Sequence, residues 1–420
     1  MSVYLERYAF EALKIEEPTN PETGLIVVIP VYNEPNLLPA LESLYRCKLP
    51  HTDVEVIIVL NEAESCEKNI LVQNNVTFTQ TQDWIQAHKK SGLQFFLSRV
   101  KLPNKHAGVG LARKAGMDEA VRRFDRANNQ KGIILCYDAD CTCSTNYLSE
   151  VVEAFDQLEL GGASIYFEHP TDLLKPNEQV AIVQYELHLR YYVNALRQAG
   201  YPYAYHTIGS SMAVRSDVYQ KAGGMNKRKA GEDFHFLHKI IPYGNYGEIN
   251  KATVYPSARI SDRVPFGTGK AMGAWKEQNM KVFNSYDPQI FDLLKLLLKQ
   301  VPKHYKATYE KAVYELPKLI IQYLEHENYE KELKRINRQS ISLISFIHKW
   351  FLWFNGLRAL HFVHFMRDNA YPSLPVAKAA SRLYHLKTEN PKELLEFYRN
   401  KDRAFKSSRI DLKNLYSLFQ

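Results

Sequence analysis

From residue 24 to about residue 168, the chain alternates short, β-rich apolar runs with longer amphipathic segments. Strands are expected at residues 25–31, 54–60, 93–100, 132–137 and 163–167. The first, second and fourth of these are nearly continuous apolar runs, as expected for strands that are covered on both faces. Helices are expected at residues 36–46, 79–89, 108–124 and 145–158. This alternation predicts an α/β fold with a mainly parallel, doubly wound sheet.

The pattern changes toward the C-terminus. Between residues 171 and 269 the alternation loosens, and we expect a helix at 177–197, a strand at 211–215 and a helix that begins at Glu232. From about residue 272 onward only helices are expected, including those at 289–300, 309–324, 339–367 and 391–405. We therefore predict an N-terminal segment (1–23), an α/β domain (24–270) and a C-terminal all-helical extension (271–420).

Composition narrows the class of protein only in part. A chain of 420 residues that is 45% hydrophobic can bury a large core, which excludes a disordered chain. Its net charge of +8 suits phosphates or an anionic lipid surface as well as a nucleic acid. The five cysteines lack the spacing of a disulfide framework, and residues 1–18 contain no apolar signal segment. A reducing, cytoplasmic setting is therefore expected.

The most apolar stretch, residues 341–354, is interrupted by His348 and Lys349. It falls short of the roughly 20 apolar residues that span a membrane. Two interpretations of its many aromatic side chains remain open: a packed core helix, or a helix lying in a membrane interface. In the second case the protein would be peripheral on the inner face of a membrane.

Asp138 and Asp140 follow the fourth expected strand directly. In an open α/β sheet, ligands bind at the carboxyl ends of the strands, so both carboxylates are expected at the binding edge. Residues two apart in an extended segment share a face and can converge on one cation. Carboxylate oxygens suit Mg²⁺ or Mn²⁺. The alternative is that one of them simply caps the following helix.

Two further groups of charged residues are candidates for catalysis or for binding a phosphate. Glu232 and Asp233 begin a helix after Gly231, where they could complement the helix dipole or supply a general base. Arg259 and Arg263 lie in a loop of turn-forming residues and could clamp a phosphate bidentately, or could belong to a solvated surface loop. The Cys141 and Cys143 pair lacks partners for a thiolate metal site, so these two are expected to be small, semi-buried residues.

Three strings occur in order along the chain: V-V-I-P-V-Y-N-E at 27–34, Y-D-A-D at 137–140 and G-E-D-F at 231–234. Together they resemble the motifs of a family-2 glycosyltransferase with the GT-A fold, over about residues 24–269. Y-D-A-D is similar to the metal-binding D-x-D motif of the family. G-E-D-F is similar to its acceptor-side pair, which implies that Asp233 is the catalytic base and Glu232 its acceptor-binding neighbour.

The resemblance also implies a set of donor-binding residues. The base and ribose would lie near Pro30, Tyr32 and Glu34, and near the end of the second strand. There this chain has Asn61 where the family usually has an aspartate. The segment G-V-G-L-A-R-K-A-G is similar to the helix that flanks the donor sugar and phosphates, and its candidates are Gly108, Arg113 and Lys114. Residues 206–215 resemble the stretch that lines the acceptor pocket.

The implied activity is an inverting, Mn²⁺- or Mg²⁺-dependent transfer of a sugar. The donor would be a nucleoside-diphosphate sugar, and the acceptor a saccharide or a lipid-linked hydroxyl in cell-surface polysaccharide or glycolipid assembly. No nucleic acid is expected as a partner. Two alternatives remain: a sugar-phosphate nucleotidyltransferase, whose glycine-rich signature is missing near residues 30–34, and a catalytically silent GT-A scaffold.

Overall fold

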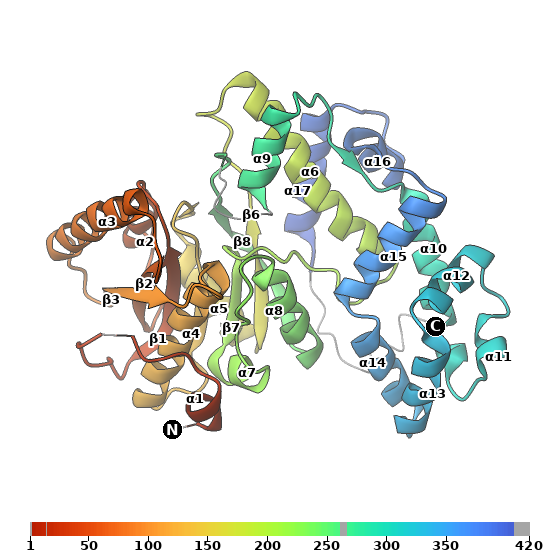
Figure 1. Ribbon diagram of the computed structural model, residues 1–420, viewed down its shortest axis with the longest axis horizontal. Coiled ribbons are helices and arrows are strands. Elements are labelled where there is room, and N and C mark those ends of the chain that lie inside the picture. The colour runs from red at the N-terminus through yellow and green to blue at the C-terminus, as the bar shows by residue number, and fades with distance from the viewer. Residues whose placement is uncertain (1, 14, 261–266, 407–420) are drawn as a thin grey trace. The chain divides into compact units, whose positions relative to one another are not determined.

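The computed structural model describes residues 2–13, 15–260 and 267–406 and divides the chain into two compact units (Figure 1). Among the described residues, the α/β unit comprises 2–13, 15–175, 207–260, 267–277 and 403–406, and the helical unit comprises 176–206 and 278–402. Residues 176–206 therefore pack with the helical unit, whereas the sequence analysis placed its boundary at residue 270.

Within its described residues, the α/β unit contains an eight-stranded sheet in the order β3-β2-β1-β4-β7-β6-β8-β5. The strands are β1 (Thr23–Val31), β2 (Asp53–Ala63), β3 (Leu93–Leu102), β4 (Ile133–Cys136), β5 (Thr142–Cys143), β6 (Gly162–Phe167), β7 (Met212–Arg215) and β8 (Tyr246–Tyr255). Pairing is parallel from β3 through β2 and β1 to β4, and again between β6 and β8, whereas β5 and β7 pair antiparallel. The predicted α/β class with a mainly parallel sheet is confirmed.

The helices of this unit are α1 (Val3–Arg7), α2 (Leu38–Tyr45), α3 (Lys68–Ala87), α4 (Val109–Arg126), α5 (Tyr147–Gln157), α7 (Ser216–Lys221), α8 (Glu232–Ile240) and α9 (Thr268–Glu277). The chain moves outward from β1 to β3 and then returns through α4 to β4, on the other side of β1. Because parallel crossovers are right-handed, this reversal puts α4 on the opposite face from α2 and α3. The strand order switches between β1 and β4, and ligands bind at such a point in open α/β sheets.

The parallel strands could be predicted from the sequence because they are buried along almost their whole length. Every residue of β4 and β6 is buried, as are all residues of β1 except Gly24. On one face the sheet lies against α4 at Gly116, where an added Cβ would come within 2.4 Å of Val28 Cγ1. Helix α4 therefore packs closely against β1 at Val28.

Helix α3 and strand β8 differ from expectation because polar residues interrupt their apolar patterns. Helix α3 is longer than the expected 79–89 segment, and its buried residues include Asn74, Thr77 and Thr81, which give no apolar signal. Strand β8 was not predicted, since Glu248, Asn250 and Lys251 interrupt its apolar residues. Its register with β6 also shifts between Ile165 and Phe167.

The helical unit contains α6 (Pro176–Gln198), α10 (Pro288–Gln300), α11 (Tyr309–Val313), α12 (Lys318–His326), α13 (Tyr329–Gln339), α14 (Leu343–Trp353), α15 (Gly356–Asn369), α16 (Val376–Leu383) and most of α17 (Pro391–Ala404), with the short pair β9 (Asn284–Ser285) and β10 (Leu374–Pro375). Two long expected helices are broken. Pro317 lies at the N-cap of α12, because proline cannot continue a helix from the preceding turn. Asn355 caps α15 by accepting from the amides of Leu357 and Arg358, which separates α15 from α14.

The aromatic residues of α14 belong to the core of the helical unit. Phe346, Trp350, Phe351 and Phe354 are fully buried, and the rings of Trp350 and Phe354 stack at 4.8 Å. This packing agrees with the first of the two interpretations of residues 341–354. Among the described helices, none is both long enough and apolar enough to cross a membrane.

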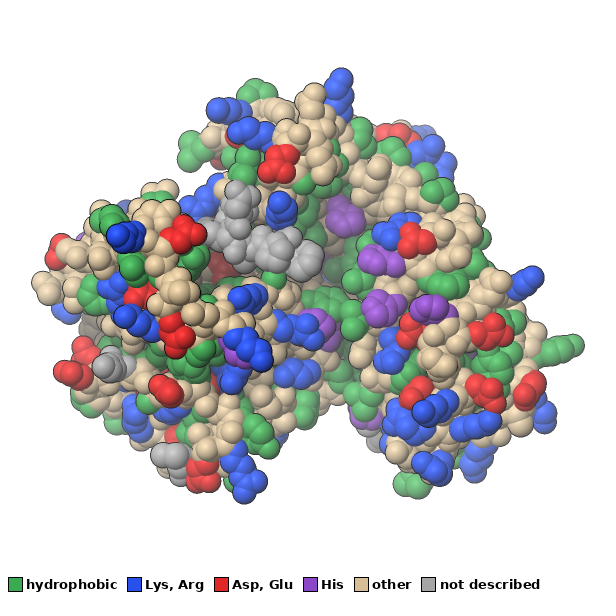
Figure 2. All heavy atoms as spheres, viewed as in Figure 1, with side chains coloured by type: hydrophobic (Ala, Val, Ile, Leu, Met, Phe, Trp, Pro, Cys, Tyr) green, Lys and Arg blue, Asp and Glu red, His purple; other side chains and the backbone are tan. Residues whose placement is uncertain are grey.

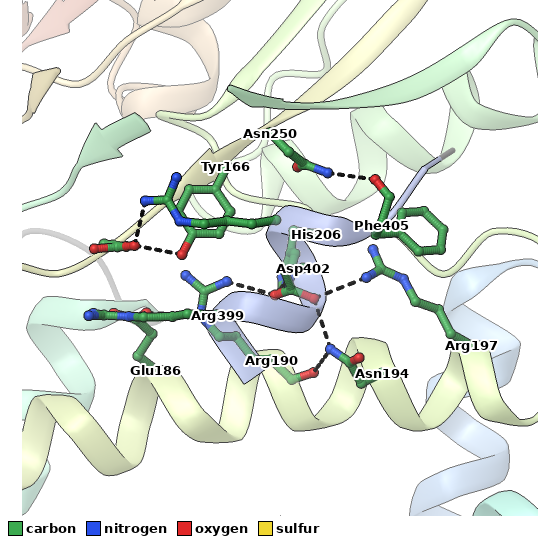
Figure 3. Close-up of polar contacts among 12 residues, drawn as sticks. Tyr166, Glu186, Arg190, Asn194, Arg197, His206, Asn250, Arg399, Asp402 and Phe405 are labelled. Carbon is green, nitrogen blue, oxygen red and sulfur yellow. Dashed lines mark hydrogen bonds and ion pairs between the residues drawn. The ribbon is translucent and has the colours of Figure 1, made fainter. Parts of the chain in front are cut away.

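A buried polar cluster around Asp402 stabilises the helical unit (Figure 3). Asp402 is 1% exposed and accepts hydrogen bonds from Arg190 at 2.6 Å, Asn194 at 2.9 Å, Arg197 at 3.0 Å and His206 at 3.1 Å. Arg190 also donates to Glu186 at 2.9 Å. The cluster joins α17 to α6, which are distant in sequence.

Elsewhere, basic and acidic side chains are interspersed over the face of the molecule seen in Figure 2.

Candidate active site

Two acidic side chains lie just beyond the strands at the switch point of the sheet. Glu34 follows β1 and is fully buried, and its carboxylate binds both terminal nitrogens of Arg259. The same guanidinium donates to Asp140 Oδ2 at 3.0 Å. Arg259, from the segment after β8, therefore links the carboxyl ends of β1 and β4. The phosphate-clamp candidate of the sequence analysis is thus next to Glu34 and Asp140, whereas Arg263 lies outside the described residues.

Arg113 joins the two acidic motifs. This residue of α4 is 1% exposed, and it donates to Asp138 Oδ1 at 2.5 Å and, through its other terminal nitrogen, to Glu232 Oε1. An added Cβ on Gly209 would lie 2.6 Å from the guanidinium, so the backbone there closely approaches Arg113. Residues of Y-D-A-D and G-E-D-F, which are nearly a hundred positions apart, therefore contact a single side chain.

The acid pair of G-E-D-F starts α8 after Gly231, whose φ of 64° lies in the left-handed region that glycine adopts without strain. Burial raises the pKa of Glu232 to about 7; the charge of Arg113 opposes this shift and that of Asp233 adds to it. Burial also raises the pKa of Asp233, against the opposing charge of Arg113 and hydrogen bonds from the amides of Phe234 and Gly209. Carboxyl groups with raised pKa values are suited to accepting a proton near neutral pH.

Lys114 is turned away from this site. Its ammonium is buried, donates to the hydroxyl of Tyr4 at 2.7 Å and pairs with Asp118 at 2.9 Å. Asp118 also accepts from Tyr219 at 2.7 Å and from the amide of Phe10 at 2.6 Å. Lys114 thus attaches the N-terminal segment to α4, and its contacts favour a structural role over the expected phosphate contact.

The remaining nucleotide candidates are spread along the end of the sheet. Pro30 lies within β1 opposite Val59, and Tyr32 follows the strand, partly exposed. Asn61 is 4% exposed, and its amide donates to the carbonyl of Val31 at 2.7 Å. This bond connects the ends of β1 and β2. At the position where the family usually has an aspartate, the side chain in this chain therefore holds two strand ends together.

Gly108 is the N-cap of α4, and an added Cβ would lie 3.1 Å from Cα of Lys229. The loop before α8 therefore packs closely on the start of α4. Because a residue with a side chain would be crowded there, the glycine explains how these two segments meet.

Two residues near the site were not found by sequence reasoning. Asn74 of α3 accepts from the amide of Asn33 at 3.1 Å and donates to the carbonyl of Asn61 at 3.2 Å, which orders the ends of β1 and β2. It lies in the part of α3 that the apolar pattern missed. Gly209, beside Arg113 and Asp233, lies within the 206–215 stretch that the resemblance indicated, but no pattern singled it out.

Asp138 and Asp140 are the candidate metal ligands. The side chains of Asp138 and Asp140 are 36% and 26% exposed, and they offer the oxygen donors that Mg²⁺ and Mn²⁺ prefer. In the described part of the chain, no three or more His, Cys, Asp or Glu side chains are grouped to hold a metal ion. A Mg²⁺-type ion commonly takes one or two protein carboxylates and completes its shell with phosphate and water. The pair therefore fits a metal that arrives with a phosphorylated substrate.

The sheet with its switch-point acids is typical of an enzyme that acts on a nucleotide-linked substrate. Residues 26–223 match the model of the family described as Glycosyl transferase family 2. The matched region covers 198 of the 420 residues, from β1 to just after α7, and this region is similar to a family-2 glycosyltransferase.

Similar solved structures include residues 1–349 of S. aureus TarS, alone and in complex with UDP-GlcNAc. Both are 15% identical to this chain, and each comparison covers 94% of this chain and 90% of TarS 1–349, with TM-scores of 0.37 and 0.39. Scores this low leave the assignment resting on the family match. No curated protein matches the chain significantly.

Proposed function

We propose that the protein transfers a sugar from a nucleoside-diphosphate sugar to an acceptor hydroxyl, with inversion at the anomeric carbon. The observation that carries this proposal is the position of Arg113 between Asp138 and Glu232. One buried guanidinium contacts both residues, which supports placing the proposed donor-side and acceptor-side motifs at one site. A family-2 glycosyltransferase needs this proximity, since donor and acceptor react there.

On the donor side, Tyr32 and Glu34, just after the end of β1, would bind the base and ribose. Arg259 would contact the diphosphate, since a guanidinium binds phosphate oxygens bidentately. Its present partners, Glu34 and Asp140, support a role at this end of the sheet. Arg263, four residues further on, is proposed as its companion from the sequence alone.

Mn²⁺ or Mg²⁺ would be held by Asp138 and Asp140 and would neutralise charge on the leaving nucleoside diphosphate. Arg113 does complementary work within the chain. It orients Asp138 and compensates the charge of the buried Glu232.

On the acceptor side, Asp233 would act as the general base. It takes the proton of the acceptor hydroxyl while that oxygen bonds to the anomeric carbon and the bond from this carbon to the phosphate oxygen breaks. Burial raises its pKa, which makes the carboxylate a stronger base than an exposed aspartate. Attack from the face opposite the diphosphate gives the inverted product. Glu232 would bind the acceptor beside it.

The test is a panel of nucleotide sugars incubated with the protein and Mn²⁺, with release of nucleoside diphosphate as the readout. Asp233→Asn should lower transfer at least about 10³-fold while nucleotide affinity stays within about twofold, because a general base acts on the proton and not on the donor. Asp83→Asn, an exposed aspartate on α3, is the matched control and should retain full activity.

The outcomes separate the candidate functions. Release of pyrophosphate from a nucleoside triphosphate and a sugar phosphate would indicate a nucleotidyltransferase instead. Nucleotide binding without turnover of any donor would indicate a silent scaffold. Loss of nucleotide affinity with retained transfer in Asp233→Asn would refute the role of that residue as base.

An acceptor in cell-surface polysaccharide or glycolipid assembly, and a cytoplasmic position peripheral to a membrane, complete the proposal. Support for the membrane contact comes from the net charge of +8 and from apolar side chains exposed on and before α14, with Ile341 93% and Leu352 45% exposed. Sedimentation with anionic liposomes at low salt tests it. Protein that stays in the supernatant would contradict it.

A further inference from the structure

Two cysteines that are distant in sequence are in contact within the α/β unit. The sulfur atoms of Cys47 and Cys143 are 3.7 Å apart. Cys47 immediately follows the C-cap of α2, and Cys143 is the second residue of β5, three positions after Asp140. Neither the proposed transfer reaction nor the metal candidate uses these thiols.

The surrounding backbone holds the two segments together. The amide of Lys48 donates to the carbonyl of Thr145 at 2.7 Å, directly beside both cysteines. Ser43, one turn earlier in α2, accepts from each thiol: its carbonyl from Cys47 at 3.3 Å and its hydroxyl from Cys143 at 3.7 Å. The proximity of the sulfurs therefore follows from the packing of α2 against β5.

The other three cysteines have different surroundings, and all five lie in the described part of the chain. Cys136 is buried and donates to the sulfur of Met117 at 3.7 Å. Cys141 is buried, and burial raises the pKa of its thiol. Cys66 is partly exposed, just before α3. These thiols provide internal controls for the reactivity of the pair.

We propose that Cys47 and Cys143 are a modification site: they form a reversible intramolecular disulfide with a disulfide oxidant such as oxidised glutathione. The sulfurs must approach by about 1.6 Å to reach the S–S bond length of roughly 2.05 Å. Cys143 is partly exposed and Cys47 is 2% exposed, so the reagent reaches Cys143 first.

The reaction is a thiol–disulfide exchange in two steps. The hydrogen bond with Cys47 and burial raise the pKa of the Cys143 thiol, so this step is slow. Cys143 loses its proton, and its thiolate attacks oxidised glutathione, which forms a mixed disulfide and releases one glutathione. Cys47 then attacks the sulfur of Cys143 and releases the second glutathione. Two protein thiols lose their protons and two electrons, and one oxidised glutathione becomes two reduced molecules.

In the reduced pair, the hydrogen bond from Cys143 lowers the pKa of the Cys47 thiol and outweighs the effect of burial, but this bond is lost once Cys143 carries glutathione. The second step is favoured by Lys90, whose charge also lowers the pKa of the Cys47 thiol. The ammonium of Lys90 donates to the carbonyl of Cys47 at 3.0 Å and so lies close to this thiol. The crosslink would connect α2 to β5. Strand β5 follows Asp140 and pairs with β8, where Cys143 lies opposite Val254.

The test uses the reduced full-length protein and oxidised glutathione. Thiols are counted in denaturant before and after oxidation, and the disulfide is mapped by proteolysis and mass spectrometry. We expect the count to fall from five to three per chain, with the Cys47 and Cys143 peptides joined, and dithiothreitol to restore all five. Cys66→Ser is the matched control and should still form the crosslink.

Cys47→Ser and Cys143→Ser should each abolish the crosslink, with the thermal unfolding midpoint used to verify that each variant folds. In Cys47→Ser, Cys143 should instead retain a glutathione adduct, because no second thiol displaces it. Wild-type protein in which Cys47 and Cys143 both stay free, or in which Cys143 keeps glutathione while Cys47 stays free, would overturn the proposal. A disulfide that maps to Cys141 or Cys66 would also overturn it.

Discussion

Replacing Asp402 by asparagine removes the negative charge from the buried cluster that joins α17 to α6 in the helical unit (Figure 3). In the wild type, the carboxylate oxygens accept from Arg190, Asn194, Arg197 and His206 at 2.6 to 3.1 Å. Asparagine retains the shape and one acceptor oxygen. Its amide nitrogen, however, would face donors, so the buried Arg190 and the partly buried Arg197 lose the charge of Asp402.

The size of the effect follows from the partners that remain. Arg190 keeps Glu186 at 2.9 Å, and Arg197 keeps the carbonyl of Ala204 at 3.2 Å. Because each arginine retains one acceptor, the loss resembles one broken buried ion pair, which costs about 3–5 kcal/mol of unfolding free energy. At roughly 2–4 °C per kcal/mol for a domain of this size, the unfolding midpoint should fall by roughly 6–20 °C.

The assay is urea unfolding followed by tryptophan fluorescence, in which Trp350 and Trp353, 0% and 4% exposed, report on the helical unit. Asp292→Asn, an exposed aspartate on α10, is the matched control and should stay within about 0.5 kcal/mol of wild type. A loss below about 1 kcal/mol in Asp402→Asn would refute the reasoning, because the cluster would then contribute no more than a surface ion pair.

The dependence on pH provides a second check. Burial by itself would raise the pKa of Asp402, but the hydrogen bond from His206 and the charges of Arg190 and Arg197 outweigh it and hold the pKa well below its usual range. A lowered pKa in the folded state contributes stability that is present above the ordinary value of about 3.9 and is lost as the pH falls below it. Burial lowers the pKa of His206 and Asp402 opposes that shift. The difference between wild type and variant should therefore be constant only above about pH 7, and it should shrink below about pH 4.

Three further predictions concern the active site. Arg113→Lys should lower kcat/KM by roughly 10–100-fold, because one ammonium cannot bind Asp138 and Glu232 together and a charge-assisted hydrogen bond contributes about 1.5–3 kcal/mol. Arg122→Lys on the same helix is the control, and equal activity in both variants would contradict the bridging role. Glu232→Gln should change the pH dependence of stability, since the pKa of Glu232 is raised to about 7. A raised carboxyl pKa costs stability as the pH rises from about 4.5 through 7, by about 3 kcal/mol at 1.36 kcal/mol per unit, and the Gln variant should lack this loss in urea unfolding at pH 5 and 8. Parallel slopes for the two proteins would disprove the shift. Removing divalent metal with EDTA should abolish nucleoside diphosphate release, and Mn²⁺ should restore it; full turnover in EDTA would show that the aspartates act without a metal.

Much of the site could be anticipated because it uses residues at the ends of elements. Asp138 and Asp140 follow β4, and Glu232 and Asp233 open α8, as the apolar pattern and turn residues predicted. Arg113, expected near the donor phosphates, instead contacts both acidic motifs. The sequence could not reveal this bridge, because it depends on how α4 and α8 meet.

The direction of its side chain explains why one candidate, Lys114, does not contact the site. Lys114 is adjacent to Arg113 but lies about 100° around the helix, so it meets Tyr4 and Asp118 instead. Neighbouring basic residues on one helix thus serve different purposes, one in the site and one in attaching the N-terminal segment. A motif matched by residue type cannot distinguish them.

The sequence alone determined the class of fold, because buried strands and amphipathic helices space their apolar residues differently along the chain. It also indicated the family, through motifs at the ends of strands and the starts of helices. Only the tertiary structure decided which charges meet: Arg259 with Glu34 and Asp140, Asp402 with α6, and Cys47 with Cys143. Such contacts join residues that are more than ninety positions apart, and their geometry depends on packing between elements, which no local pattern records.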